Sequence, residues 1–253
     1  MHRHGGAAVT RPRISVVIPV HDDAVELGAC LRLLARQTVA PDEVVVVDNA
    51  STDASVEVAL AYGARVVTEP RLGIPVAAAC GYDAATGDVI ARLDADSRPE
   101  PDWVAQIARA MSDPRVDAVT GPGRFHDLPA VLRPPAALVY LGAYFVLTYL
   151  ALAHVPLWGS SMAVRRTSWQ RVRDEVHRLD DVHDDMDLSF VLGPESVIRY
   201  DRGLRVGVSA RSLRGWPQLR RRMGRAVTTL RLNWAVRPPW TRWQDRIRRI
   251  SAG

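Results

Sequence analysis

Four short apolar runs alternate with helical segments in the first half of this 253-residue chain, and this alternation limits the possible folds more than any other feature. The first two runs are almost continuously apolar, as in strands that are covered on both faces. The apolar runs are residues 14–20, 44–47, 65–68 and 89–93. Between them, and again at 103–111, apolar residues recur at helical spacing. Because strands that alternate with helices form parallel sheets, we expect an α/β fold with a mostly parallel central sheet flanked by helices.

Carboxylates follow three of these four runs. Asp22 comes after the first run, Asp48 after the second, and Asp94 and Asp96 after the fourth. Ligands of such sheets bind beyond the carboxyl ends of the strands, so we expect these side chains to share one edge of the sheet. Two carboxylates one residue apart can bind a single hard cation, and Mg²⁺ and Mn²⁺ prefer oxygen ligands. An Asp-x-Asp pair is common in surface turns, and only its place directly after a buried strand indicates a metal site.

Several longer motifs occur in a fixed order along the chain. They are Ile-Ser-Val-Val-Ile-Pro-Val-His-Asp at 14–22, Gln37, Glu-Val-Val-Val-Val-Asp-Asn-Ala-Ser-Thr-Asp at 43–53, Gly-Asp-Val-Ile-Ala-Arg-Leu-Asp-Ala-Asp at 87–96, and the segments 159–166 and 184–189. In order and spacing this set resembles the inverting family 2 glycosyltransferases. The resemblance implies a Rossmann-like GT-A fold and transfer of a sugar from a UDP-, GDP- or dTDP-sugar to an acceptor hydroxyl with inversion. It also implies Mg²⁺ or Mn²⁺ as the cofactor.

The resemblance assigns a set of residues near the strand ends to the nucleotide sugar. They are Pro19, His21, Asp22, Asp48, Arg71, Asp94 and Asp96. Asp48 would accept a hydrogen bond from the base, Asp94 would lie near the ribose or the metal, and Asp96 would ligate the metal. Two alternatives stay open. Asp48 could instead cap a helix, although Ser51 is the better cap candidate, and Arg71 could contact the diphosphate or form a surface ion pair.

The acceptor side is expected from the last two motifs. The run Asp-Asp-Met-Asp-Leu-Ser that begins at Asp184 resembles the family's Glu-Asp-x-Asp-Leu-Ser, with aspartate in the place of the glutamate. The resemblance makes Asp185 the general base that takes the proton of the acceptor hydroxyl, whereas the alternative is an acidic first turn of a helix. Trp158, Gly159, Ser160 and Asp184 would line the acceptor pocket. The ring of Trp158 would face a sugar or pack in the core.

Two regions of the second half indicate either a membrane surface or extra packing on the core. Residues 136–153 form a run without a charge, of marginal length for a membrane span. A span would separate Asp96 from Asp185, so we expect either a buried helix or a helix at the membrane surface that guides a lipid-linked acceptor. After Asp201 the only acidic residue is Asp245, while arginines and tryptophans recur. Such a segment suits an anionic membrane surface or a surface helix packed on the core.

The Arg-rich end of the chain also contains a motif that is expected to contact the donor. Gln-Leu-Arg-Arg-Arg at 218–222 resembles the Gln-x-x-Arg-Trp motif of processive members, with Arg222 in the place of the tryptophan. Arg221, Arg222 or Arg225 would then reach the diphosphate. The charge comes without a nucleic-acid-binding motif, so we expect no nucleic-acid partner.

These features divide the chain into three parts. They are a disordered tail (1–13), a GT-A catalytic domain (14–210) with a nucleotide-binding half (14–125) and an acceptor half (126–210), and a basic amphipathic segment (211–253). The isolated Cys30 and Cys80 fit a reducing cytoplasm, and the basic segment would place the protein at the inner face of the plasma membrane. The acceptor would there be lipid-linked or a cell-envelope glycan.

Two other functions remain as alternatives. A nucleotidyltransferase of similar topology would have a Gly-rich loop with a lysine after the first strand, where this chain has Pro-Val-His-Asp and lacks lysine throughout. A catalytically silent module that binds nucleotide sugars would have lost a key carboxylate, yet Asp48, Asp94, Asp96 and Asp185 are all present. The sequence therefore favours the enzyme.

Overall fold

The computed structural model describes residues 11–213 and 215–252. Its main sheet has the strand order β3-β2-β1-β4-β8-β6-β9. The strands are β1 (Ile14–Val20), β2 (Glu43–Asp48), β3 (Arg65–Thr68), β4 (Val89–Arg92), β6 (Ala118–Thr120), β8 (Met162–Arg165) and β9 (Ile198–Tyr200). The first four strands run parallel, β9 is parallel to β6, and β8 is antiparallel to both of its neighbours. The mostly parallel sheet expected from the sequence is confirmed.

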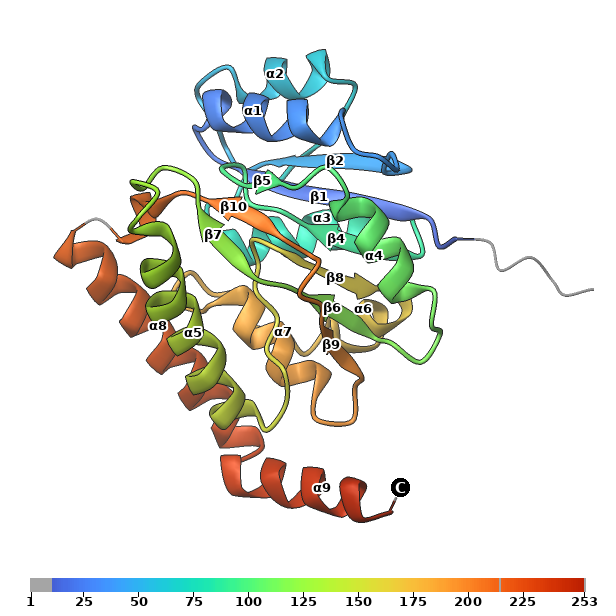
Figure 1. Ribbon diagram of the computed structural model, residues 1–253, viewed down its shortest axis with the longest axis vertical. Coiled ribbons are helices and arrows are strands. Elements are labelled where there is room, and N and C mark those ends of the chain that lie inside the picture. Colours follow the sequence, from blue (N-terminus) through green and yellow to red (C-terminus); the bar gives the residue numbers. More distant parts are fainter. Residues whose placement is uncertain (1–10, 214, 253) are drawn as a thin grey trace, which may run out of the picture.

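Helices cover both faces of this sheet (Figure 1). They are α1 (Ala24–Leu34), α2 (Ser55–Ala61), α3 (Ile74–Ala84), α4 (Trp103–Met111), α6 (Arg166–Val172) and α7 (Asp184–Leu192). Alternate side chains of a strand point to opposite faces. Val16 and Ile18 of β1 therefore join a core with α1 and α4, whereas Val17 joins a second core with α3 and α7. The two cores fix the strands so that β1, β2 and β4 end at one edge.

A second, smaller sheet has the order β5-β10-β7. Its strands are β5 (Arg98–Pro99), β7 (Gly123–Phe125) and β10 (Val206–Val208). β10 pairs in the antiparallel sense with β5 and in the parallel sense with β7. Neither β5 nor β7 was expected from the sequence, because two or three residues are too few to show a period.

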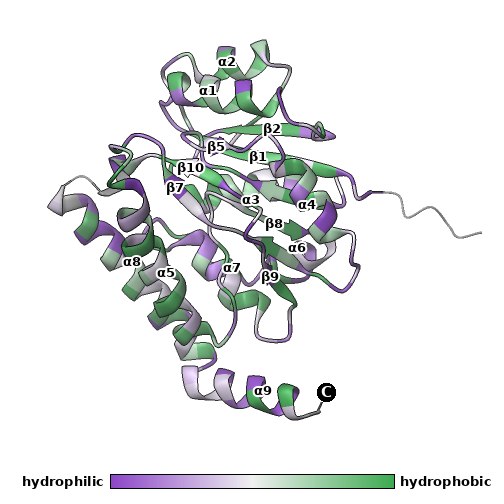
Figure 2. Ribbon diagram, viewed as in Figure 1, coloured by the Kyte–Doolittle hydropathy of each residue, from purple (hydrophilic) through white to green (hydrophobic). Residues whose placement is uncertain are grey.

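The long uncharged run forms α5 (Arg133–Leu152), and most of this helix is not buried. Leu141, Thr148 and Leu152 are its buried residues, while Leu138 and Leu147 are 76% and 66% exposed. Figure 2 shows hydrophobic residues along the helix. Within the described part of the chain, α5 alone is long and apolar enough to cross a membrane, and 17% of its apolar stretch is buried. The expectation of a buried helix is wrong for most of α5, because only one stripe packs on the core.

The Arg-rich end forms α8 (Trp216–Val236) and α9 (Pro239–Ala252), and α8 lies beside α5 (Figure 1). On α8, Ala226, Leu230 and Trp234 pack against the ends of α5 and α7. Met223 and Val227 are 59% and 42% exposed. The apolar stripe of this helix is therefore divided between the core and the surface.

The fold begins earlier than the sequence indicated. Of the expected tail, residues 1–10 lie outside the described part of the chain. The guanidinium of Arg11 lies 2.8 Å from the Asp42 carboxylate. The backbone N–H of Arg13 donates to Asp88 at 3.0 Å. These two bonds tie residues 11 and 13 to the loops at the start of β2 and β4.

Candidate active site

Asp22 holds the loops after β1 and β2 together. Its carboxylate accepts hydrogen bonds from the backbone N–H groups of Thr52 (2.6 Å) and Asp53 (3.2 Å). Hydrogen bonding, chiefly from Thr52, lowers the pKa of Asp22. The neighbouring His21 places Nδ1 2.9 Å from the carbonyl oxygen of Asn49. Both predicted residues therefore lie at the expected edge, where the carboxylate of Asp22 shapes the adjoining loop.

Asp48 ends β2, the strand next to β1. It is 8% exposed, and its carboxylate accepts the backbone N–H of Ser51 at 3.0 Å. α2 begins only at Ser55 and has no side-chain cap. The helix-cap alternative is therefore wrong for both Asp48 and Ser51. Pro19 is the register partner of Val47, which places it in β1 beside the end of β2.

Asn49, which was not among the residues expected in the site, organises the loop after β3. Its side-chain nitrogen donates to the carbonyl oxygens of Glu69 (2.9 Å) and Arg71 (2.6 Å), and its oxygen accepts the Gly73 N–H at 2.8 Å. The side chain of Arg71 is 66% exposed, and its guanidinium lies 3.3 Å from the Glu69 carboxylate. The ion-pair alternative for Arg71 is therefore present, and its contact with a nucleotide stays a prediction. Asparagine in a turn is too common to have indicated this role.

The Asp94–Asp96 run leaves the sheet directly after β4. Asp94 uses both carboxylate oxygens: one lies 3.1 Å from the Arg92 guanidinium, and the other accepts the Ser160 hydroxyl at 2.6 Å. Ser160 shortly precedes β8, which pairs with β4. The antiparallel pairing of these two strands therefore brings the predicted donor and acceptor motifs together.

Arg92 is a buried cation next to this run. Its side chain is 4% exposed and forms ion pairs with Asp94 and Asp184. One guanidinium nitrogen also lies 3.5 Å from the Tyr82 hydroxyl. Burial alone would lower the pKa of Arg92, but its interactions with Tyr82 and Asp94 raise it overall. Arg92 was not expected in the site, because its only signal in the sequence is a charge inside an otherwise apolar strand.

Asp184 and Asp185 begin α7. The carboxylate of Asp185 accepts the backbone N–H groups of Gly159 and Met186, each at 2.8 Å. A Cβ atom at position 159 would lie 3.0 Å from the guanidinium carbon of Arg92, so glycine allows the close approach. Through Arg92 and Gly159, the carboxylates after β4 and those at the start of α7 form one site.

Asp96 faces a second arginine that was not expected in the site. One guanidinium nitrogen of Arg211 lies 2.8 Å from Asp23 and 3.2 Å from Asp96. Burial, and then the charge of Asp94, raise the pKa of Asp96. The position therefore favours a cation, and Arg211 supplies one.

The carboxylates fit a metal that is shared with a substrate. No group of three or more His, Cys, Asp and Glu side chains within residues 11–213 and 215–252 could hold a metal ion alone. Mg²⁺ and similar ions often take one or two protein carboxylates and complete their shell with phosphate oxygens and water. Asp96 suits that role better than Asp94, because both oxygens of Asp94 already bond to protein groups.

Trp158 lies beside this site but is buried. It is 9% exposed, and its ring fills the space where a side chain at Gly123 would lie, next to Leu141. The core alternative for Trp158 therefore holds, and a contact with an acceptor sugar stays a prediction.

The three arginines of the basic end lie in the first half of α8. Arg222 donates a hydrogen bond to the Tyr140 hydroxyl, and its carbonyl oxygen lies 3.1 Å from Nε2 of His183, next to α7. Burial, and then the neighbouring charges, Arg221 foremost, lower the pKa of Arg225. A cationic cluster thus lies beside the start of α7, and its contact with a diphosphate stays a prediction.

Two solved glycosyltransferases have a similar fold. The mannosyltransferase PcManGT from Pyrobaculum calidifontis, solved with GDP-Man and Mn²⁺, has a TM-score of 0.71 at 23% identity, over 92% of this chain and 68% of that one. Glucosyl-3-phosphoglycerate synthase from Mycobacterium tuberculosis, solved with Mn²⁺, UDP-glucose and phosphoglyceric acid, has a TM-score of 0.63 at 19% identity, over 92% and 85% of the two chains. The likeness establishes the GT-A glycosyltransferase fold.

Sequence comparison then identifies the family. Glycosyl transferase family 2 matches residues 15–172, more than half of the chain, so the chain belongs to this family. Glycosyltransferase AglE from Haloferax volcanii is 31% identical over 120 residues, which cover 44% of this chain and 40% of AglE. Validoxylamine A glucosyltransferase from Streptomyces hygroscopicus subsp. limoneus is 37% identical over 117 residues, which cover 43% and 26% of the two chains. The matched region thus spans less than half of these relatives.

Proposed function

We propose that this chain transfers a sugar from a nucleoside diphosphate sugar to an acceptor hydroxyl with inversion, and that Asp185 is the general base. One observation carries the proposal. Arg92 forms ion pairs with Asp94 on the predicted donor side and with Asp184 on the predicted acceptor side. Two motifs about ninety residues apart are thereby neighbours in one partly exposed site. A base beside the donor site is the arrangement that an inverting displacement requires.

The chain's own residues would divide the work as follows. Asp48 at the end of β2 would bind the base of the nucleotide, while Asp96, with Asp94 beside it, would hold Mg²⁺ or Mn²⁺. That ion would offset negative charge on the leaving diphosphate. The two backbone N–H groups that bind Asp185 fix the orientation of its carboxylate. Asp185 then takes the proton of the acceptor hydroxyl as that oxygen attacks the anomeric carbon from the face opposite the diphosphate.

The solved relatives support the choice of donor and metal. PcManGT was solved with GDP-Man and Mn²⁺, and glucosyl-3-phosphoglycerate synthase with UDP-glucose and Mn²⁺. Either base is therefore a candidate for this chain. A nucleotidyltransferase or a silent binding module is less well supported, because the matched family consists of glycosyltransferases and Asp48, Asp96 and Asp185 are all present.

The position of the helices supports a peripheral membrane location. α5 carries exposed leucines and valines, and α9 exposes Trp240, Ile247 and Ile250 beside arginines. Apolar and basic residues together suit an anionic membrane surface. We place the protein at the cytoplasmic face of such a membrane, with residues 14–125 as the donor half, 126–210 as the acceptor half and 211–253 as the membrane-facing segment.

The base assignment is tested with Asp185→Asn. Asparagine keeps the shape of the side chain but cannot take the proton, so we expect sugar transfer, or donor hydrolysis, to fall by about 10² to 10⁴. Donor binding should stay close to wild type in a thermal-shift titration of UDP-, GDP- and dTDP-sugars with Mg²⁺ or Mn²⁺. Asp174→Asn is the matched control, since that carboxylate is 88% exposed. Wild-type turnover in Asp185→Asn would refute the assignment, and loss of donor binding would indicate a structural role.

The metal assignment is tested with Asp96→Ala. We expect the variant to lose the thermal shift that Mn²⁺ adds to the donor, because Asp96 is the carboxylate best placed for the ion. Turnover should fall with it. A variant that keeps the full Mn²⁺-dependent shift would show that Asp96 does not ligate the metal.

A further inference from the structure

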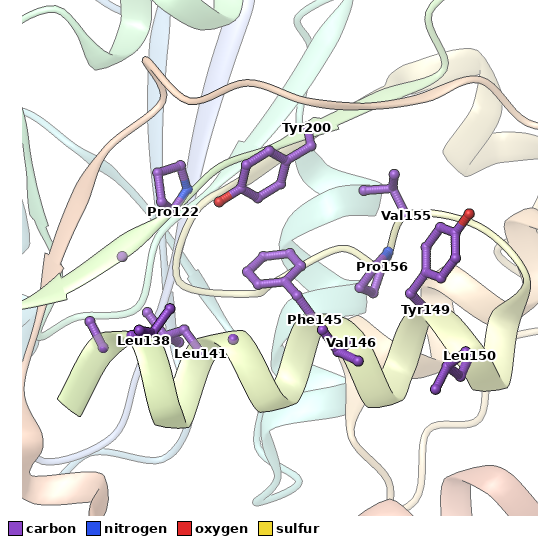
Figure 3. A pocket seen from close by; sticks show the side chains of 13 residues that line it. Pro122, Leu138, Leu141, Phe145, Val146, Tyr149, Leu150, Val155, Pro156 and Tyr200 are labelled. Carbon is purple, nitrogen blue, oxygen red and sulfur yellow. The ribbon is translucent and has the colours of Figure 1, made fainter. Parts of the chain in front are cut away.

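An apolar groove runs along α5, outside the site described above. Its volume is about 610 Å³, within the range of about 300–1,000 Å³ that is typical of sites for small ligands. Figure 3 shows its walls: Leu138 and Val146 extend from α5, and Pro122, Val155 and Tyr200 lie opposite. The side chains in the walls are apolar or aromatic, with tyrosine hydroxyls as their only polar groups.

The α5 side of this groove is open to solvent. Leu138, Val146 and Leu150 are 76%, 60% and 54% exposed, and all three line the groove. A contiguous apolar surface of this kind is costly in water, and it marks a binding surface in most proteins. The groove therefore needs an occupant.

The inner wall of the groove is shared with the proposed acceptor site. Gly123 and Leu141 line the groove, and both lie against the ring of Trp158. The next residue, Gly159, donates its backbone N–H to Asp185. A molecule in the groove would thus lie one side chain away from the segment that holds the proposed base.

The charges near the groove indicate the kind of surface from which a bound molecule would enter it. α9 packs against α5, and the guanidinium of Arg246 lies 5.3 Å from the ring centre of Tyr149, which lines the groove. The arginines on the outer surface of α8 and α9 are Arg220, Arg221, Arg231, Arg248 and Arg249. Exposed arginines on the two helices that contact α5 complement an anionic lipid layer.

The chemistry of the walls selects a hydrocarbon chain over a peptide. A peptide brings backbone N–H and C=O groups, which apolar walls leave without partners, and each such group is costly to bury. A hydrocarbon chain brings no polar groups. We propose that this groove binds the hydrocarbon chain of a lipid-linked acceptor, whose hydroxyl-bearing head then reaches Asp185. This inference rests on the proposed function, because it names the class of acceptor for the same site.

The test uses a dansyl-labelled fatty acid as the probe and fills the groove with a leucine. Gly142 lines the groove in the middle of α5, and a Cβ atom there would meet only a side-chain carbon of Leu138, at 3.9 Å. The Cβ atom of Gly142→Leu therefore fits without strain, and the longer side chain should fill part of the groove. Ala143→Leu is the matched control, because Ala143 is exposed on the same helix and does not line the groove.

We expect dansyl-undecanoate to bind the wild-type protein at least tenfold more tightly than dansyl-hexanoate, since each buried methylene adds up to about fourfold. Gly142→Leu should weaken undecanoate binding at least tenfold, and Ala143→Leu less than twofold. Equal binding of the two probes by the wild-type protein, or equal effects of the two variants, would overturn the proposal. If sedimentation shows a dimer that Gly142→Leu dissociates, the groove is an interface between two copies and the proposal fails.

A second pair of variants tests the same groove in case Gly142→Leu does not fold. Val146 and Leu147 are 60% and 66% exposed, and only Val146 lines the groove. Val146→Asp should weaken undecanoate binding as strongly as the filled groove, whereas Leu147→Asp should leave it unchanged. The thermal shift with nucleotide sugar should be wild-type in all four variants. Loss of undecanoate binding with an unchanged donor-induced thermal shift concerns the groove alone. Loss of the donor-induced shift with unchanged undecanoate binding concerns the proposed function alone.

Discussion

The lowered pKa of Glu43 gives a magnitude for its effect on the free energy of unfolding. It begins β2, and its side chain is 15% exposed. The carboxylate accepts hydrogen bonds from the Ser15 hydroxyl (2.5 Å), the Arg65 guanidinium (2.7 Å) and the backbone N–H of Thr86 (2.9 Å). These bonds join the start of β2 to β1, to β3 and to the loop before β4. We expect Glu43→Gln to destabilise the fold in a way that depends on pH.

The magnitude follows from the pKa of Glu43. Burial alone would raise it, but the hydrogen bonds from Ser15, Thr86 and Arg65 lower it from 4.5 to about 2. At about 1.4 kcal/mol for each tenfold change, the charged carboxylate adds about 3 kcal/mol to the free energy of unfolding. Because the folded-state pKa is the lower one, this contribution is fully present above pH 4.5 and is lost as the pH falls toward 2. At pH 3 about 1.5 kcal/mol should remain.

Urea unfolding followed by tryptophan fluorescence measures the effect. At pH 7 the free energy of unfolding of Glu43→Gln should lie about 3 kcal/mol below that of the wild type, and at pH 3 the difference should be about half as large. Glu57→Gln is the control, because that side chain is exposed on α2. An equal loss for Glu43→Gln at both pH values would refute the reasoning, as would no loss at pH 7.

Three further variants test packing and charge pairing in the fold. A Cβ atom at Gly81 of α3 would lie 2.7 Å from a side-chain carbon of Val47, so Gly81→Ala should lower the free energy of unfolding by about 1–3 kcal/mol. Gly224→Ala has open space and should raise it by up to about 1 kcal/mol in the same urea titration. Arg92→Met leaves the partly buried Asp184 without its cation and should cost about 3–5 kcal/mol; a variant as stable as the wild type would contradict the role given to the ion pair.

Local sequence patterns were sufficient for the parallel half of the fold. β1, β2, β3 and β4 lie within one residue of the expected runs, because each is a continuous β-rich segment between helices. β5 and β7 were not expected, since two or three residues are held as strands by their partners and not by their own pattern. The carboxylates at the strand ends were predictable because parallel strands must end at the same edge.

The partners of those carboxylates were not predictable. Arg92 and Arg211 are two of many arginines in a chain without lysine, and nothing local separates them from the surface ones. What distinguishes them is position: the β4–β8 pairing and the start of α7 bury Arg92 between two carboxylates, and the segment before α8 brings Arg211 to Asp96. A role that depends on long-range packing leaves no periodic signal in the sequence.

The partners of the apolar residues of α5 were not predictable from the sequence either. Its hydropathy equally fitted a buried helix and a helix at a surface, because composition counts apolar residues without saying which stripe finds a partner. The structure decides this: Leu141 and Leu152 face the core, whereas Leu138, Val146 and Leu147 do not. A helix that only needed to complete the core would gain solubility from polar residues at those exposed positions. Exposing these apolar side chains to water is unfavourable in free energy. An apolar ligand or surface that covers them therefore explains their presence better than packing of the core does.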